Sequence, residues 1–162
     1  MSLSLSCTAG GDDADLKPPL GYIAPAVHPL LRGPIYGRQG FGRGFWPMEF
    51  AAGKTWRWMA DRGEIRLPKR PTRQSLRIVG WLPLEFLEGP PTIQITLDNH
   101  QLDRFVAADR VLDRDYRVNP AEWGDVSSAV LLIETSATAR VSGDTRDLGV
   151  AIEAIKWEDL PP

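Results

Sequence analysis

Hydrophobic and polar residues alternate along most of the chain from Phe45 onward, and this period of two predicts β-strands. The clearest case is segment 92–97, in which Ile93, Ile95 and Leu97 alternate with threonine and glutamine. Such a pattern is typical of a strand with one buried face. The same alternation predicts further strands at 45–50, 55–59, 65–67, 76–86, 100–106, 116–118, 129–135 and 148–157.

The segments between these strands are rich in turn-forming residues. Asp98 and Asn99 separate two of the predicted strands, and they indicate a tight hairpin because Asn tolerates the left-handed conformation. Residues 120–123 indicate a short helical turn, and no long amphipathic helix is predicted. Eight or nine strands joined in this way predict an all-β fold, an antiparallel two-sheet β-sandwich.

Composition divides the chain into three parts. Residues 1–16 are small, polar and acidic, which predicts a disordered lead-in. Residues 17–44 mix prolines and glycines with isolated apolar residues, which predicts an extended arm rather than a helix. The Gly/Arg run at 37–44 lacks the Lys-Ser/Thr of a phosphate loop, so we interpret it as a flexible approach to the first strand. Residues 45–158 form the predicted sandwich domain.

Charge and hydropathy exclude several classes of protein. A net charge of −2 gives no reason to expect a nucleic-acid surface, and we interpret the basic residues between 62 and 73 as a solvated rim. No apolar run approaches the ~18 residues of a membrane span. No signal peptide is visible, so the compartment stays open, with a slight preference for the cytoplasm. One cysteine, Cys7, cannot build a disulfide framework within the chain.

Four charged residues near strand ends are the first candidate site: Glu49, Arg57, Asp144 and Arg146. Carboxylates and guanidiniums pair bidentately, so these residues are candidates for a site that binds sugar hydroxyls or a carboxylate. The alternative is a salt-bridge network that fixes the first strand against the last. The second interpretation is favoured, because a fold needs such a contact to join two distant chain ends.

Six tryptophans supply the second set of candidates. Indole rings stack on the apolar faces of sugars, although core packing must account for most of the six. Alternation places Trp56 and Trp58 on one face and Trp46 with Met48 and Phe50. Trp81 is out of phase with the apolar positions of segment 76–86 and is predicted to point outward. We therefore take Trp58 and Trp81 as candidate ligand-binding residues.

No catalytic arrangement, metal site or cofactor is predicted. His28 and His100 lack the spacing of a metal pair, and no Ser-His-Asp relay is indicated. Asp109, Asp113 and Asp115 are oxygen ligands of the kind that Ca²⁺ prefers. Interleaved arginines would repel the ion, so we interpret this segment as a solvated loop.

Three separated peptides are similar to parts of one family. Residues 44–49 resemble its opening strand, Arg57-Trp58 its second strand and residues 144–151 its closing strand. Together they resemble the jelly-roll, galactose-binding-like β-sandwich domains of bacteria, which are often appended to glycosyltransferases of surface-polysaccharide metabolism. The resemblance covers about residues 41–158. It implies a two-sheet sandwich and an accessory role in carbohydrate biology, without implying an active site.

These observations lead us to expect a non-catalytic accessory module that binds a saccharide or supports polysaccharide synthesis. The alternative is a protein-interaction or oligomerisation domain without a small-molecule ligand, in which the Pro-rich segment 17–36 docks on a partner chain. An enzyme such as a small hydrolase is the least favoured hypothesis, because no spacing predicts an acid/base pair in a cleft.

Overall fold

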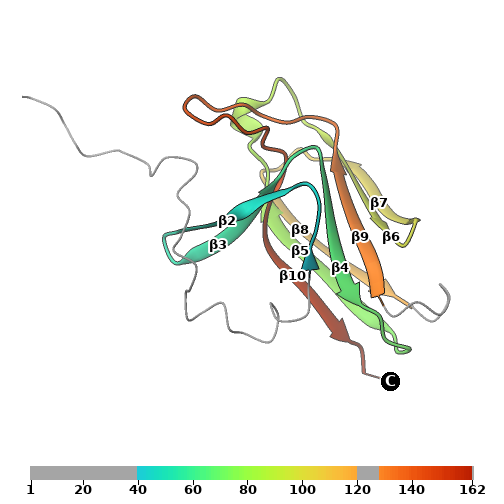
Figure 1. The fold of residues 1–162 in the computed structure, drawn as a ribbon. Coiled ribbons are helices and arrows are strands. Elements are labelled where there is room, and N and C mark those ends of the chain that lie inside the picture. The colour runs from blue at the N-terminus through green and yellow to red at the C-terminus, as the bar shows by residue number, and fades with distance from the viewer. Residues whose placement is uncertain (1–39, 120–127, 162) are drawn as a thin grey trace, which may run out of the picture.

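The computed structural model describes residues 40–119 and 128–161, which form two five-stranded antiparallel sheets (Figure 1). The first sheet has the order β1-β4-β9-β6-β7 and the second the order β2-β3-β10-β5-β8. The strands are β1 (Gly40–Phe41), β2 (Phe45–Ala51), β3 (Lys54–Met59), β4 (Arg62–Pro68), β5 (Gln74–Trp81), β6 (Thr92–Leu97), β7 (His100–Val106), β8 (Val111–Val118), β9 (Ser128–Thr135) and β10 (Ala151–Asp159). The predicted all-β, two-sheet sandwich is confirmed.

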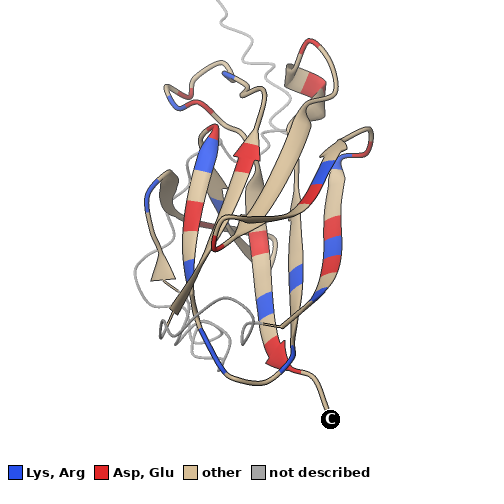
Figure 2. Ribbon diagram, turned by 90° about the vertical axis from the view of Figure 1, so that its right-hand side faces the viewer, with Lys and Arg blue, Asp and Glu red and all other residues tan. Residues whose placement is uncertain are grey.

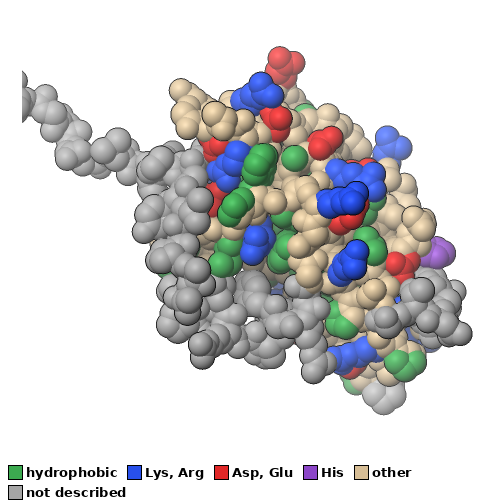
Figure 3. Space-filling view, viewed as in Figure 1, with side chains coloured by type: hydrophobic (Ala, Val, Ile, Leu, Met, Phe, Trp, Pro, Cys, Tyr) green, Lys and Arg blue, Asp and Glu red, His purple; other side chains and the backbone are tan. Residues whose placement is uncertain are grey.

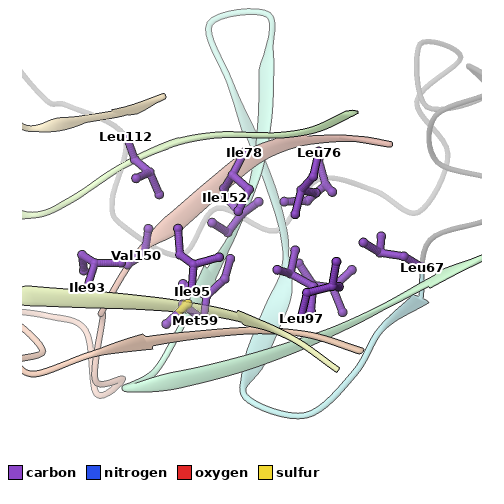
Figure 4. Packing of buried hydrophobic residues seen from close by; sticks show 14 of the residues in the cluster. Met59, Leu67, Leu76, Ile78, Ile93, Ile95, Leu97, Leu112, Val150 and Ile152 are labelled. Atoms are coloured by element: carbon purple, nitrogen blue, oxygen red, sulfur yellow. The ribbon is translucent and has the colours of Figure 1, made fainter. Parts of the chain in front are cut away.

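The core lies between the two sheets and consists of the apolar residues that alternate along each strand. Ile93, Ile95 and Leu97 of β6 are fully buried, as their period of two predicts. They pack in one cluster with Leu76 and Ile78 of β5, from the facing sheet (Figure 4). Burial of aliphatic side chains from both layers is the main stabilising contribution to a fold of this kind.

The predicted hairpin between β6 and β7 is present. Asp98 and Asn99 have φ angles of 45° and 67°. Both residues are therefore left-handed, as a two-residue turn of this kind requires. Ala52 and Gly53 join β2 to β3 in the same way, with φ angles of 50° and 77°. These two hairpins connect strands that are neighbours in both sequence and space.

Several of the predicted strand boundaries are wrong, among them the start of β4, which is Arg62 rather than residue 65. The strand predicted over 76–86 ends at Trp81, since Pro83 has no N–H to donate, and a short 3₁₀ helix, Leu84–Phe86, follows. The last strand starts at Ala151, because Leu148 instead forms an isolated bridge with Ala139. The strand predicted over 116–118 begins at Val111.

The extended β8 also corrects the solvated loop predicted around the acidic residues of this region. Asp113 lies within the strand and pairs with Arg77 of β5, with an Nη2–Oδ2 distance of 2.6 Å. Asp115 accepts a hydrogen bond from Ser75. These cross-strand contacts account for the alternating charges that the sequence shows here. Among the described residues, no group of three or more His, Cys, Asp or Glu side chains is arranged to hold a metal ion.

Several predictions fall wholly or partly on residues outside the described ranges. These are the lead-in at 1–16, most of the arm at 17–44 and the helical turn at 120–123. The described end of the arm contains β1, in which Gly40 and Phe41 pair with Arg66 and Ile65 of β4.

Charges of both signs are interspersed over the described surface. Acidic and basic residues alternate along the strands (Figure 2) and lie next to one another on the face shown in Figure 3. At one open side of the sandwich, Tyr116 of β8 donates a hydrogen bond to Asp103 of β7 at 2.9 Å, and Arg114 stacks on Phe105. The described part of the chain contains no helix with the length and hydropathy of a membrane span.

Candidate functional site

The outer face of the second sheet carries a row of apolar side chains that face away from the main core. The register pairs Trp58 of β3 with Ala151 of β10, Ala151 with Trp81 of β5, and Trp81 with Val111 of β8. Residues that pair directly across antiparallel strands share a face. The row therefore crosses four adjacent strands, and the prediction that Trp81 is out of phase with the core is confirmed.

Three tryptophans of this face pack against one another. The rings of Trp56 and Trp81 have centroids 5.2 Å apart and an interplanar angle of 63°. Those of Trp58 and Trp81 are 6.0 Å apart at 78°. Both pairs have the edge-to-face geometry that aromatic quadrupoles favour. Trp81 thus lies between the other two rings and fixes their relative orientation.

The three rings line a pocket of about 180 Å³, which we call the tryptophan pocket. Two further segments complete its lining. One is the turn after β5 together with the residue before β8, which contribute Pro83, Glu85, Phe86 and Arg110. The other is the segment between β9 and β10, which contributes Val141 and Leu148. The pocket therefore combines residues that are up to 92 positions apart in the sequence.

Both flanking segments are held by backbone hydrogen bonds. Leu82 donates to the carbonyl of Arg110 at 2.9 Å, so the two parts of the first segment are tied together. In the second segment, Ala139 and Leu148 exchange backbone hydrogen bonds at 2.8 and 2.9 Å. The walls of the pocket are thus fixed by the fold before any ligand arrives.

The polar groups of the pocket are few. Glu85 and Arg110 form an ion pair with an Nη1–Oε1 distance of 3.4 Å, and both side chains are exposed to solvent. The indole N–H groups of Trp56 and Trp58 are buried and have no hydrogen-bond acceptor among the described residues. The lining is therefore mainly apolar with a small number of directional groups, which is the usual character of a small-molecule site.

Trp58 does not have the exposure that its prediction as a stacking platform implied, because it is only 3% exposed. It packs in a second apolar cluster with Leu148 and Ala151, and Trp46 also contacts this cluster. The segment between β9 and β10 covers it. Trp58 contributes to the pocket as part of its lining, whereas Trp81 is partly exposed.

Three of the four predicted charged residues come together beside this cluster. Arg146 donates to Oε1 of Glu49 at 2.5 Å and to Oδ2 of Asp144 at 2.7 Å. The side chains of Glu49 and Asp144 are 2% and 5% exposed, and that of Arg146 is 14% exposed. We call these three residues the arginine clasp. It joins β2 to the segment before β10, so the expected contact between the first and last parts of the fold is present.

The side-chain hydrogen bonds of the arginine clasp join a guanidinium to two carboxylates, so they are charge-assisted. Hydrogen bonds from Arg146 hold the pKa of Asp144 below its ordinary value, although burial opposes the shift. The carboxylates of Asp144 and Glu49 in turn raise the pKa of the Arg146 guanidinium. The guanidinium also lies 5.9 Å from the centre of the Trp46 ring. Arg146 is therefore fixed on several sides by its partners.

Arg57 is not part of the arginine clasp, and its expected place there is wrong. In the β2–β3 ladder, Glu49 pairs with Trp56 while Arg57 pairs with Met48. Neighbouring positions point to opposite faces of a sheet, so Arg57 lies on the face opposite Glu49. Its guanidinium stacks on Phe41 at 5.1 Å and donates to the carbonyl of Trp46, and burial lowers its pKa.

Trp46 also differs from the sequence-based expectation. Simple alternation predicts that Trp46 lies with Met48 and Phe50, but it packs with the outer cluster while Phe45 packs against the main core. A register shift between Phe45 and Met48, around Pro47, accounts for this change of face. Five further lining residues carry no sequence signal for a site: Glu85, Phe86, Arg110, Val141 and Leu148. They lie in connecting segments, although alternation predicts that Phe86 and Leu148 belong to strands.

Comparison with known proteins adds distant structural likenesses. The sequence matches no protein-family model and no curated protein sequence. A family 35 carbohydrate-binding module from Clostridium thermocellum is similar, with 12% identity, a TM-score of 0.43, and 75% of this chain and 98% of that chain covered. A CBM35 from Paenibacillus barcinonensis has 11% identity and a TM-score of 0.41, with 78% and 96% covered.

A third similar structure is an exo-β-1,3-galactanase from Phanerochaete chrysosporium, solved with β-1,3-galactotriose. It has 8% identity and a TM-score of 0.38, and the match covers 74% of this chain and 26% of that one. At these identities and TM-scores, the likeness carries no argument about ligand or activity. Any function of the present chain must be derived from its own side chains.

Proposed function

We propose that the chain is a non-catalytic carbohydrate-binding module and that the tryptophan pocket is its binding site. The observation that carries the proposal is the convergence of Trp56, Trp58 and Trp81 on one pocket of the outer sheet face. Indole rings offer an apolar surface to the C–H face of a sugar, and Glu85 and Arg110 offer an acceptor and donors to its hydroxyls.

The lining supports binding rather than hydrolysis. Glycoside hydrolysis generally needs two carboxyl groups on either side of the bond to be cleaved. Among the described residues that line the pocket, Glu85 is the one acid, and it pairs with Arg110. We assign a structural role to the arginine clasp, since its carboxylates are almost fully buried and already paired.

Isothermal titration with a panel of glucose, galactose, mannose, xylose and glucuronic acid, and with short oligosaccharides of each, tests the proposal. We expect at least one series to bind and Trp81→Ala to abolish or strongly weaken its binding. The control is Trp157→Phe, because Trp157 donates to the carbonyl of Pro68 and does not line the pocket. Equal weakening by both variants, or no binding to any series, would contradict the proposal.

The wider role in polysaccharide synthesis remains a prediction from the resemblance. The alternative function, docking of segment 17–36 on a partner chain, is also a prediction, since those residues lie outside the described ranges. Light scattering after size-exclusion chromatography, with and without residues 1–36, distinguishes it: a mass unchanged by the deletion counts against the arm as an oligomerisation element.

A further inference from the structure

The size of the tryptophan pocket restricts what it holds. Its volume of about 180 Å³ is below the ~300–1,000 Å³ of sites that enclose drug-sized molecules. A single sugar ring is therefore the largest unit that the pocket encloses. Any further ring of a saccharide chain must lie outside the pocket, on the surface of the protein.

The surface around the pocket differs from one side to the other. On the side of the turn after β5, the apolar surface continues past the pocket: Phe86 is 50% exposed, and Val111, the register partner of Trp81, is 68% exposed. On the opposite side, the wall formed by Val141 and Leu148 belongs to a segment that carries the exposed ion pair Arg140–Asp147. The surface for a second ring therefore lies toward Phe86 and Val111.

The polar groups also restrict the chemistry of the ring. The N–H groups of Trp56 and Trp58 are buried beneath the solvent-accessible surface, so they do not reach a ligand in the pocket. The charged groups that a ring meets are those of Glu85 and Arg110. Glu85 and Arg110 cancel each other's charge, so the rim has no net attraction for an ionised sugar. Neutral hydroxyls fit this set of groups better than a carboxylate does.

We infer that the tryptophan pocket binds the terminal ring of a neutral saccharide chain and that the next ring lies over Phe86 and Val111. This inference rests on the proposed function and narrows it in two ways. It specifies the end of a chain rather than its interior, and it specifies a neutral sugar rather than a uronic acid.

A length series tests the inference with the intact protein. The probes are methyl glycosides and oligosaccharides of two to five units from the gluco, galacto, manno and xylo series. In a series that binds, we expect affinity to rise about three- to tenfold from one unit to two, the range of one aromatic contact, and then to stay within about twofold. With a long polysaccharide of that series, the stoichiometry should follow the number of chain ends.

Substitutions locate the two rings. Val111→Ala, at a position outside the pocket lining, should reduce the gain from the second unit and leave the affinity for the methyl glycoside unchanged, whereas Trp81→Ala, which removes the central ring of the pocket, should weaken both. Val106→Ala is the matched control, since Val106 is 60% exposed on β7 of the other sheet and should change neither affinity.

The outcomes separate the inference from the proposed function. Several proteins bound per polysaccharide chain, affinity that keeps rising beyond two units, or tighter binding of glucuronic acid than of the neutral sugars would overturn the inference. Each of these results would leave carbohydrate binding at the tryptophan pocket intact. Absence of binding to every probe would remove both.

Discussion

At the scale of single residues, the most constrained group is the Glu49 carboxylate. Glu49 is 1% exposed, and its described charged partner is Arg146. A carboxylate that is removed from water remains ionised at low cost only when its partner and hydrogen bonds stay in place. The arginine clasp therefore acts as a unit, and the loss of one member leaves buried charge behind.

Arg146→Ala should destabilise the protein by about 3–5 kcal/mol, because it leaves two buried carboxylates without their cation. The measurement is the free energy of unfolding from urea denaturation. Arg140→Ala is the matched control: it breaks the Arg140–Asp147 pair in the same segment, where the side chains are 76% and 45% exposed, and should destabilise the protein far less. Similar losses in both variants would show that the burial of the clasp has no energetic consequence.

The arginine clasp should also make stability depend on pH. Because Arg146 lowers the pKa of Asp144 from 3.8 in the folded state, the stabilisation is fully present above that value. It is lost as the pH falls through the lower, folded-state pKa. The difference in unfolding free energy between the unsubstituted protein and Asp144→Asn should therefore stay constant above about pH 5 and shrink as the pH falls from about 5 to 3 and below.

Urea denaturation of both proteins across this range checks the prediction. The pKa values of Asp113, Asp147 and Asp159 are also lowered by their partners, but these residues are present in both proteins and cancel in the difference. A difference that stays constant down to pH 3 would count against the contribution of Asp144.

At the scale of strands, the contact between β5 and β10 depends on a residue without a side chain. A Cβ atom built on Gly80 would lie 2.1 Å from the carbonyl oxygen of Ala151, so the strands would have to separate. Gly80→Ala should therefore cost at least ~2 kcal/mol, through overpacking. Gly89→Ala is the control, because a Cβ there meets nothing within 4 Å, and its effect should stay within ~0.5 kcal/mol. Thermal unfolding of the two variants distinguishes them, and equal melting temperatures would refute the argument.

The strands follow from the alternation of apolar and polar residues, and the same alternation predicts the face on which Trp81 lies. Local irregularities in the strands account for the predictions that are wrong. The register shift around Pro47 changed the face of Trp46, and Pro83 ended β5 before the apolar pattern did. The burial of Trp58 depends on Leu148, which is 90 residues away in sequence and lies in the connection that precedes β10. Long-range covering of this kind leaves no local signal, so the lining of the pocket was not predictable.

At the scale of the whole molecule, most strand pairs join distant parts of the chain. The hairpins β2–β3 and β6–β7 are local, whereas β10 pairs with β3 and β5, and β9 pairs with β4 and β6. Forming distant pairs requires closure of long loops before contacts compensate for the lost entropy. A sandwich of this topology is expected to fold slowly.

Refolding after stopped-flow dilution from denaturant should therefore take milliseconds to seconds, the range typical of all-β sandwiches. Intrinsic tryptophan fluorescence is a direct probe, since Trp58 becomes buried only when the segment before β10 covers it. Full recovery of the native fluorescence within the mixing dead time would contradict this expectation, provided that the signal comes from the native state and not from an early intermediate.

The register shift in β10 has a consequence for how the sequence tolerates change. Between Ile152 and Ala154 this strand advances two residues while β5 advances one, from Gly80 to Val79, so Glu153 is the additional residue. Deleting Glu153 would leave a regular ladder with Ile155 still directed into the core. Deletion of any other residue of β10 would move each of the following side chains to the opposite face of the sheet. In diverged relatives, an alignment gap within this strand is therefore expected at Glu153.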